Sequence, residues 1–443
     1  MRDYSELYRH VDDQADRYLD MLKTLISQPS VSATGEGLRE CGELVKELLM
    51  DVGMRVETWE SGVSGPAVLA EVNAEAHATI MFYNHYDVQP PDPLERWETD
   101  PFTPSLRNGR LYGRGAADNK GNIAARLAAV DTVLATLGEL PVNIKFVIEG
   151  GEEVGSPDLE KFALENKEKL FADGCIWEYG YVDRRGSPVI NLGVKGMLYV
   201  ELESHGIEIH SSWGGIVENP AWKLVYTLSR LRDSEGRILL EDFYTGIEEV
   251  DEAVEELLEK IDLESIMPES VKPRSVGRSM VRRLLLEPAC NLCGISSGYT
   301  GAGSKTSIPQ SAKARIDFRL VPGQSPERIF QTLQKHLEPH HISARRLHGY
   351  PAARTPPTSY LAGLVSDTAR EVYRVEPTLI PISPASGPMY VFTDLLGVPC
   401  VSTGVGYLGS NVHGPNENIR VEDFIKGVKH IALILCNFHS YLS

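Results

Sequence analysis

Two apolar stretches of strand length in this chain end in clusters of histidine and acidic residues. Residues 78–83 read Ala-Thr-Ile-Met-Phe-Tyr, and residues 142–148 are similarly rich in β-branched and aromatic side chains, as buried strands are. His85 and Asp87 follow the first stretch, and adjacent glutamates at 152–153 follow the second. In open α/β sheets, binding residues gather at the carboxyl ends of strands. The pattern therefore predicts a parallel sheet with a polar site at one edge.

Helices and strands alternate through the rest of the N-terminal part. Apolar residues recur at helical spacing over residues 8–27 and 38–52, and the small-residue segment 122–137 predicts a third helix that can pack closely on a sheet. Further strands are predicted at residues 55–60 and 67–72. This alternation predicts α/β architecture with a mostly parallel central sheet.

The pattern changes near Lys195-Gly196. Residues 198–203 and 313–320 alternate apolar and polar side chains, which is typical of antiparallel strands with one face in water. A charged, helix-prone insertion covers about residues 233–288, and apolar strands and helices return near the C-terminus. We therefore expect an α/β domain interrupted by an inserted α+β domain, an antiparallel sheet plus helices. The expected boundaries are 1–195 and 351–443 for the first domain and 196–350 for the second.

The composition argues against several functional classes. The 443 residues carry a formal net charge of −18 with no basic run, so we expect no nucleic-acid partner and no anionic membrane partner. No stretch approaches the roughly 20 apolar residues that cross a bilayer, and no basic-then-apolar secretory signal begins the chain. Six scattered cysteines are too few for a disulfide scaffold, so we expect a reduced, cytoplasmic protein.

Further groups that could bind metal lie near predicted strand ends. Asp118 lies in the segment G-R-G-A-A-D-N-K-G, and His413 lies in N-V-H-G-P-N-E. Each of these histidines or acidic residues, taken alone, could simply be a polar side chain on the protein surface. Together, two imidazoles and several carboxylates form a ligand set for one or two zinc-like divalent ions. A two-metal centre needs a bridging carboxylate, ligands for each ion and a separate base, and this inventory meets that requirement.

The order of these motifs resembles the M20 metallopeptidases, which include carnosinase-like dipeptidases, aminoacylases and glutamate carboxypeptidases. The resemblance covers nearly the whole chain. The segment L-Y-G-R-G-A-A-D-N-K-G is especially similar to the carnosinase and cytosolic nonspecific dipeptidase branch. The resemblance implies a catalytic domain, a lid domain that also forms a homodimer, and two divalent ions. Zinc is the expected metal, with manganese and cobalt as alternatives.

The resemblance also assigns ligands to particular positions. It implies one ion bound by His85 and Glu178, a second bound by Glu153 and His413, and Asp118 as the bridge between them. The inferred reaction is hydrolysis of the amide bond of dipeptides or short peptides by a metal-activated water.

Three supporting features follow from the same resemblance. Asp87 is expected to orient His85. Glu152 is expected to be the general base, which takes a proton from the attacking water and passes it to the leaving amine. The peptide bond between Asp118 and Asn119 is expected to be cis.

Glu178 departs from the dipeptidase pattern. Its segment C-I-W-E is similar to a C-I-S-D segment of the dipeptidases, in which the aspartate is the ligand. A glutamate here resembles the acylase and carboxypeptidase branches, so an N-acyl-amino-acid amidohydrolase stays open as an alternative. A non-catalytic metal-binding scaffold is a more remote alternative, although such a protein has no need for Glu152 as a base.

The inserted domain resembles the substrate-binding segments of the family. His210 lies in G-I-E-I-H-S, similar to a motif whose histidine reaches the partner's active site in dimeric members and stabilises the oxyanion. The alternative is a surface histidine on a sheet. Arg319 suits two-point binding of a peptide carboxylate, although it could also pair with a neighbouring acid. The expected substrate contacts are Thr306, Arg319, His348 and Ser386.

Overall fold

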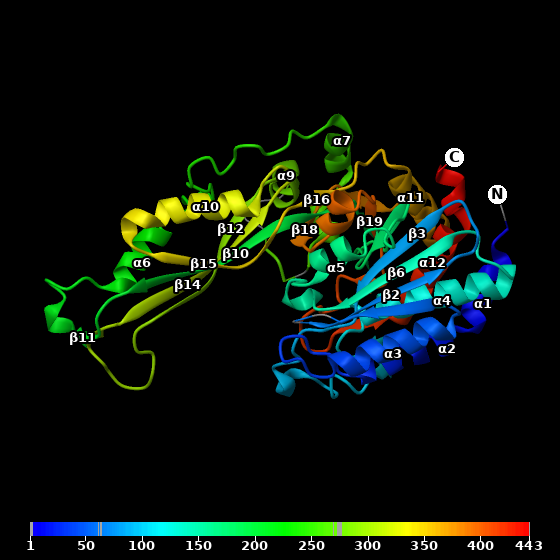
Figure 1. Cartoon of the computed structure of the whole chain (residues 1–443), viewed down its shortest axis with the longest axis horizontal. Helices are drawn as coiled ribbons and strands as arrows, with labels where there is room; N and C mark the ends of the chain where they lie inside the picture. Colours follow the sequence, from blue (N-terminus) through cyan, green and yellow to red (C-terminus); the bar gives the residue numbers. More distant parts are fainter. Residues whose placement is uncertain (1–2, 61, 63, 269, 273–276, 443) are drawn as a thin grey trace.

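The chain forms two lobes that lie end to end along the long axis of the molecule (Figure 1). The computed structural model describes residues 3–60, 62, 64–268, 270–272 and 277–442. The larger lobe holds a ten-stranded sheet and the smaller lobe a six-stranded sheet. The expected fold class, a mixed α/β sheet with a separate antiparallel sheet, is confirmed. Among the described residues, no helix combines the length and apolar character needed to cross a membrane.

Parallel strands form the centre of the ten-stranded sheet. The spatial order is β1 (Arg55–Trp59), β2 (Gly65–Val72), β6 (Asn143–Gly150), β3 (Thr79–His85), β7 (Gly174–Trp177), β19 (Cys400–Ser402), β9 (Pro188–Asn191), β8 (Tyr181–Val182) and β20 (Gly406–Tyr407), with β17 (Thr378–Ile380) beside β9. The neighbours β6, β3, β7 and β19 run parallel. Pairs toward the edges, such as β1 with β2 and β8 with β9, are antiparallel because short connections join them.

Helices cover both faces of this sheet. One face carries α1 (Ser5–Asp13), α2 (Ala15–Ser27), α3 (Leu38–Asp51), α4 (Lys120–Leu137), α11 (Tyr360–Tyr373) and α12 (Val421–Leu442). The other carries α5 (Leu159–Glu165) and the short π-helix η5 (Val391–Leu395). Along β3, Phe82 joins the first core, whereas Met81 and Tyr83 join the second. Packed side chains cover both faces of the sheet, so β3 is buried along its whole length.

The smaller lobe is built around the long strand β10 (Gly193–His205). Its sheet also contains β12 (Ala289–Ser297), β14 (Ser311–Leu320) and β15 (Ser343–Tyr350), and α6 (Pro220–Leu228) and α10 (Pro326–Leu337) pack on one face. The start of β10 instead pairs with β16 (Ala353–Arg354) and β18 (Ser383–Ser386). The partners of β10 therefore change at Gly196. From this change we propose the domain boundaries 1–195 and 351–443 against 196–350.

The helical insertion returns from the smaller lobe to the larger one. It contains α7 (Glu252–Lys260), α8 (Leu263–Ile266) and α9 (Arg278–Leu286). Leu258 and Leu263 share an apolar cluster with Val189 of β9 and Ile380 of β17. The insertion thus contacts the edge of the ten-stranded sheet, in addition to its covalent connection to the smaller lobe.

Candidate metal centre

Three parallel strands bring the first group of candidate ligands together. His85 ends β3, Glu178 follows β7 directly, and Glu152 opens the 3-10 helix η2 (Glu152–Val154) that follows β6. These strands are neighbours and run in the same direction, so their carboxyl ends lie at one edge of the sheet. One ligand atom from each of the three side chains lies within 4.8 Å of the others. The Nε2 atom of His85 is 3.7 Å from Oε2 of Glu178.

A second group lies beside the first and consists of Asp118, Glu153 and His413. Their ligand atoms also lie within 4.8 Å of one another. The Nε2 atom of His413 is 3.1 Å from Oε2 of Glu153 and 3.2 Å from Oδ2 of Asp118. The pairing of β5 (Arg110–Tyr112) with β21 (Asn418–Arg420) aligns the two loops that carry Asp118 and His413.

The carboxylate of Asp118 connects the two groups. Its Oδ1 is 3.0 Å from Nε2 of His85, whereas its Oδ2 faces His413 at 3.2 Å. A carboxylate with each oxygen directed at a different imidazole has the form of a bridging ligand. The peptide bond between Asp118 and Asn119 is cis, as the family resemblance implies.

Glu417 is a supporting residue that sequence reasoning missed. Its carboxylate accepts hydrogen bonds from the main-chain N–H groups of Ala117 at 2.9 Å and Asp118 at 3.0 Å. It also forms a buried ion pair of 2.8 Å with Arg114. Glu417 thereby fixes the loop that presents Asp118. The available signal was its place in the same short segment as His413.

Asp87 holds the acidic pair as well as the histidine. Its two carboxylate oxygens accept the N–H groups of Glu152 at 3.1 Å and Glu153 at 3.0 Å. The Nδ1 atom of His85 lies 3.0 Å from the main-chain oxygen of Asp87 and 3.4 Å from its Oδ1. Because a carbonyl oxygen can only accept, Nδ1 carries the proton in this contact. In the neutral imidazole with this proton on Nδ1, the Nε2 lone pair can bind a metal.

The crowded carboxylates fit a site for cations. Burial, followed by repulsion from Glu178, raises the pKa of Glu152 well above its ordinary value. Burial likewise raises the pKa of Glu178 to about 8. In the described part of the chain, the buried Oε2 of Glu178 has no hydrogen-bond partner. Buried acids without counter-charge are costly, and nitrogen and carboxylate donors suit zinc and similar divalent ions.

The structure places Arg319 and Ser386 close to the first group. Arg319 on β14 donates to Oγ of Ser386 at 2.7 Å and to Asp317 at 2.8 Å. At the neighbouring Gly387, an added Cβ would lie 3.7 Å from Oε1 of Glu178. Arg319 therefore pairs with a neighbouring acid, Asp317, which was the alternative to substrate binding. Its guanidinium also contacts Ser386.

His348 lies beside the segment that follows η2, whereas two other candidates lie far from this segment. His348 on β15 borders Gly155, directly after η2, where an added Cβ would be 2.9 Å from its Nδ1. His210 on β11 (Ile209–His210) and Thr306, just before β13 (Ser307–Ile308), are exposed. They lie together at the end of the smaller lobe farthest from the ten-stranded sheet (Figure 1). Within one chain, these two residues do not approach the centre.

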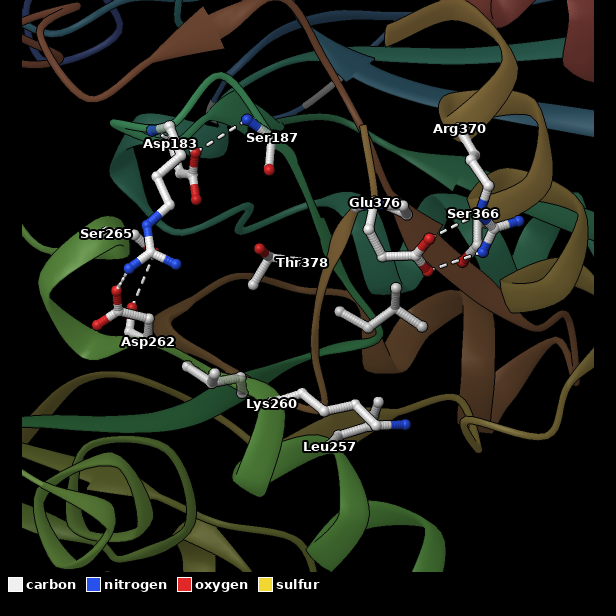
Figure 2. A pocket seen from close by; sticks show the side chains of 14 residues that line it. Asp183, Ser187, Leu257, Lys260, Asp262, Ser265, Ser366, Arg370, Glu376 and Thr378 are labelled. Atoms are coloured by element: carbon white, nitrogen blue, oxygen red, sulfur yellow. Dashed lines mark hydrogen bonds and ion pairs between the residues drawn. The ribbon is translucent and has the colours of Figure 1, made fainter. Parts of the chain in front are cut away.

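A pocket of about 440 Å³ lies away from these residues (Figure 2). It separates α7 and α8 of the insertion from α11 and β17 of the larger lobe. Arg370 forms an ion pair with Glu376 at its rim, and Arg185 forms one with Asp262. None of the predicted site residues lines this pocket.

Comparisons with known proteins found a matching family model and several similar proteins. The model of Peptidase family M20/M25/M40 matches residues 81–437. The Beta-Ala-His dipeptidase of Rattus norvegicus is 29% identical over an alignment of 475 positions, which covers 98% of this chain and 96% of that protein. The Cys-Gly metallodipeptidase dug1 of Schizosaccharomyces pombe is 25% identical, with 96% of each chain covered. The crystal structure of the M20 family metallo-carboxypeptidase Sso-CP2 from Sulfolobus solfataricus superposes with a TM-score of 0.89 at 39% identity, covering 94% of this chain and 98% of that one.

Proposed function

The chain belongs to peptidase family M20/M25/M40, and from this premise we propose that it is a di-metal exopeptidase that hydrolyses dipeptides or short peptides. The observation that carries the proposal is the carboxylate of Asp118, which faces His85 with one oxygen and His413 with the other. A carboxylate whose two oxygens face separate ligand groups is suited to bridge the two ions of a two-metal hydrolase. The names of the relatives, two dipeptidases and a carboxypeptidase, support the same class of reaction.

The proposed ligands divide between two ions. They are His85 and Glu178 for one ion, Glu153 and His413 for the other, and Asp118 for both. Zinc is the proposed metal, with manganese and cobalt as alternatives that the same donors accept. A bound pair of such ions would polarise the scissile carbonyl and lower the pKa of the attacking water.

Glu152 is the proposed general base. It is bonded through its main-chain N–H to Asp87, which fixes the start of η2. A base at this position would accept a proton from water and later deliver it to the leaving amine. A carboxylate oxygen of Glu152 also lies within 4.8 Å of ligand atoms of His85 and Glu178. An experiment must therefore show whether Glu152 acts as the base or binds a metal.

Arg319 and Ser386 are the proposed contacts for the free carboxylate of the substrate. Arg319 lies on β14 of the smaller lobe and Ser386 on β18, which pairs with the start of β10. The pair therefore joins the two proposed domains, because residue 319 lies within 196–350 and residue 386 within 351–443. A guanidinium can bind a carboxylate through two hydrogen bonds, which would restrict cleavage to the end of a peptide. His348 is a further proposed contact.

The second candidate is an N-acyl-amino-acid amidohydrolase, and the glutamate at position 178 favours it. The two candidates share the metal ligands and differ in what occupies the amine side of the substrate. A panel of dipeptides with free amines and of N-acetylated amino acids, assayed after chelation and again after zinc is restored, separates them. We expect zinc-dependent cleavage of the dipeptides. Cleavage of only the acetylated compounds would replace the proposal with the second candidate.

We also propose that the protein is a cytoplasmic homodimer in which His210 and Thr306 serve the partner's centre. Both residues are exposed at the end of the smaller lobe, next to one another, and the main-chain N–H of Ser211 donates to the carbonyl of Thr306 at 3.0 Å. An oxyanion-stabilising role requires contact with the substrate. Because His210 lies far from its own centre, only a second copy of the chain could supply that contact.

A further inference from the structure

Arg126 is a fully buried guanidinium directly beneath the first group of candidate ligands. It lies on α4, and its side chain is 1% exposed. Its Nη1 donates to the carbonyl of Tyr83 at 2.5 Å and to Oδ1 of Asn84 at 2.6 Å. Its Nη2 donates to the carbonyls of Trp177 at 2.5 Å and Glu178 at 3.2 Å. One planar group thus joins the ends of two strands.

These contacts begin where the direct pairing of the strands stops. The register between β3 and β7 ends at Phe82 opposite Ile176. Beyond that point the strands separate, and the carbonyls of Tyr83 and Trp177 accept from Arg126. The rigid fork of a guanidinium can serve two such strand ends at a fixed separation. Arg126 therefore acts as a spacer in the sheet edge.

The residues that follow the spacer are the candidate ligands themselves. Asn84 directly precedes His85, and Glu178 contributes its own carbonyl to Arg126. Asn84 also donates to Asn119, which in turn donates to the carbonyl of Glu178 at 3.0 Å. Two hydrogen-bonded routes therefore connect the end of β3 to the end of β7, and each passes through Arg126 or Asn119.

The acceptors that Arg126 uses in the described part of the chain are neutral oxygens. A guanidinium keeps its charge at neutral pH even when it is buried. A buried cation with only neutral acceptors contributes less to stability than a well-packed apolar side chain would. This arrangement is more readily explained by a role at the centre than by a role in folding.

We propose that Arg126 is a positioning residue that sets the separation of His85 and Glu178, and thereby the affinity of the first metal position relative to the second. This inference rests on the proposed function, because it assumes that the two groups bind ions. The second position depends on Asp118, Glu153 and His413, whose loops are held by Asp87 and Glu417. Arg126 donates no hydrogen bond to those loops among its observed contacts.

The test measures zinc binding to the purified full chain by competition with a chromophoric chelator. R126M removes the fork and the charge while keeping most of the volume. Outer partners of metal ligands are typically worth about 10–100-fold in metal affinity. We expect R126M to lose about that much affinity for one ion of the pair and to keep the other unchanged. R126K should show a smaller loss at the same ion, because a single ammonium cannot join both strand ends in the same way.

A matched control is R232M in the smaller lobe. Arg232 is a half-buried arginine that also donates to a main-chain carbonyl, that of Cys290 at 3.2 Å. It should bind both ions like the wild type. An equal loss of affinity for both ions in R126M, or affinities equal to those of the wild type, would overturn the inference. If R126M fails to fold, R126K decides: wild-type affinity for both ions would then overturn it.

The outcome is distinguishable from failure of the proposed function. Wild-type protein that binds two zinc ions and cleaves no peptide would contradict the proposed function and leave the role of Arg126 measurable. Wild-type protein that binds no zinc would contradict both.

Discussion

At the scale of single residues, the centre depends on carboxylates that each contact two other residues of the site. Asp87 contacts His85 and also accepts the N–H groups of both glutamates at the start of η2. Asp118 faces two histidines from opposite oxygens. Each of these carboxylates therefore couples the position of one metal ligand to the position of another.

The first prediction concerns Glu152 as the base. E152Q keeps the size of the side chain and removes its ability to accept a proton. Turnover should fall by about 10²–10⁴-fold, the usual contribution of a general base. Zinc stoichiometry, measured by metal analysis after dialysis, should stay at two ions per chain because the ligands are unchanged. Loss of one ion would instead identify Glu152 as a ligand, and retained turnover would remove it from the mechanism.

At the scale of elements, His430 gives the contact between α11 and α12 a defined pH dependence. It is buried on α12, and its Nε2 is 3.0 Å from the carbonyl of Val365 and 3.1 Å from Oγ1 of Thr368, both on α11. Burial lowers the pKa of His430 from 6.5 to about 4. The folded protein therefore keeps this imidazole neutral at pH values where the unfolded chain protonates it.

The sign of the effect follows from this difference. Above pH 6.5 the imidazole of His430 is neutral in both the folded and the unfolded protein, and the free energy of unfolding has its full value. As the pH falls from 6.5 toward 4, only the unfolded chain binds the proton, so the free energy of unfolding decreases by a total on the order of 3 kcal/mol. Urea unfolding at several pH values should show a smaller decrease in H430Q, which does not titrate. Identical pH dependence in the two proteins would contradict this assignment.

The elements that the sequence predicts best are those buried on both sides. The apolar stretch 78–83 predicts a strand, and β3 begins at Thr79 and extends to His85. The predicted helix over residues 8–27 is instead two helices, α1 and α2, which meet at Gln14. The same apolar spacing continues through both helices, because both pack on the same core. Periodicity alone therefore could not reveal the break.

The ligands could be predicted, but their supports could not. The candidate ligands form short motifs rich in histidine and acid, so the sequence displays them directly. Arg126 lies in a segment that looks like any small-residue helix, and Glu417 in a polar loop. Their partners are main-chain groups from distant segments, such as the carbonyls of Tyr83 and Trp177. No pattern within one segment encodes such a contact.

At the scale of the whole molecule, the separation of His210 from its own centre predicts that activity is shared between chains (Figure 1). In a homodimer with two-fold symmetry, each centre would combine its own Glu152 with the partner's copy of His210. E152Q and H210A dimers should each be nearly inactive. Co-expression of the two variants should form mixed dimers with one intact centre and so restore activity. Activity no greater than the sum of the separate variants would contradict the shared centre.

The central claim is that two cations lie side by side at the edge of the sheet, with Asp118 between them. Anomalous diffraction at the zinc absorption edge from zinc-loaded crystals tests it most directly. The account predicts two peaks about 3.5–4 Å apart, one beside His85 and Glu178 and the other beside Glu153 and His413. A single peak, or two peaks that the carboxylate of Asp118 does not join, would contradict it.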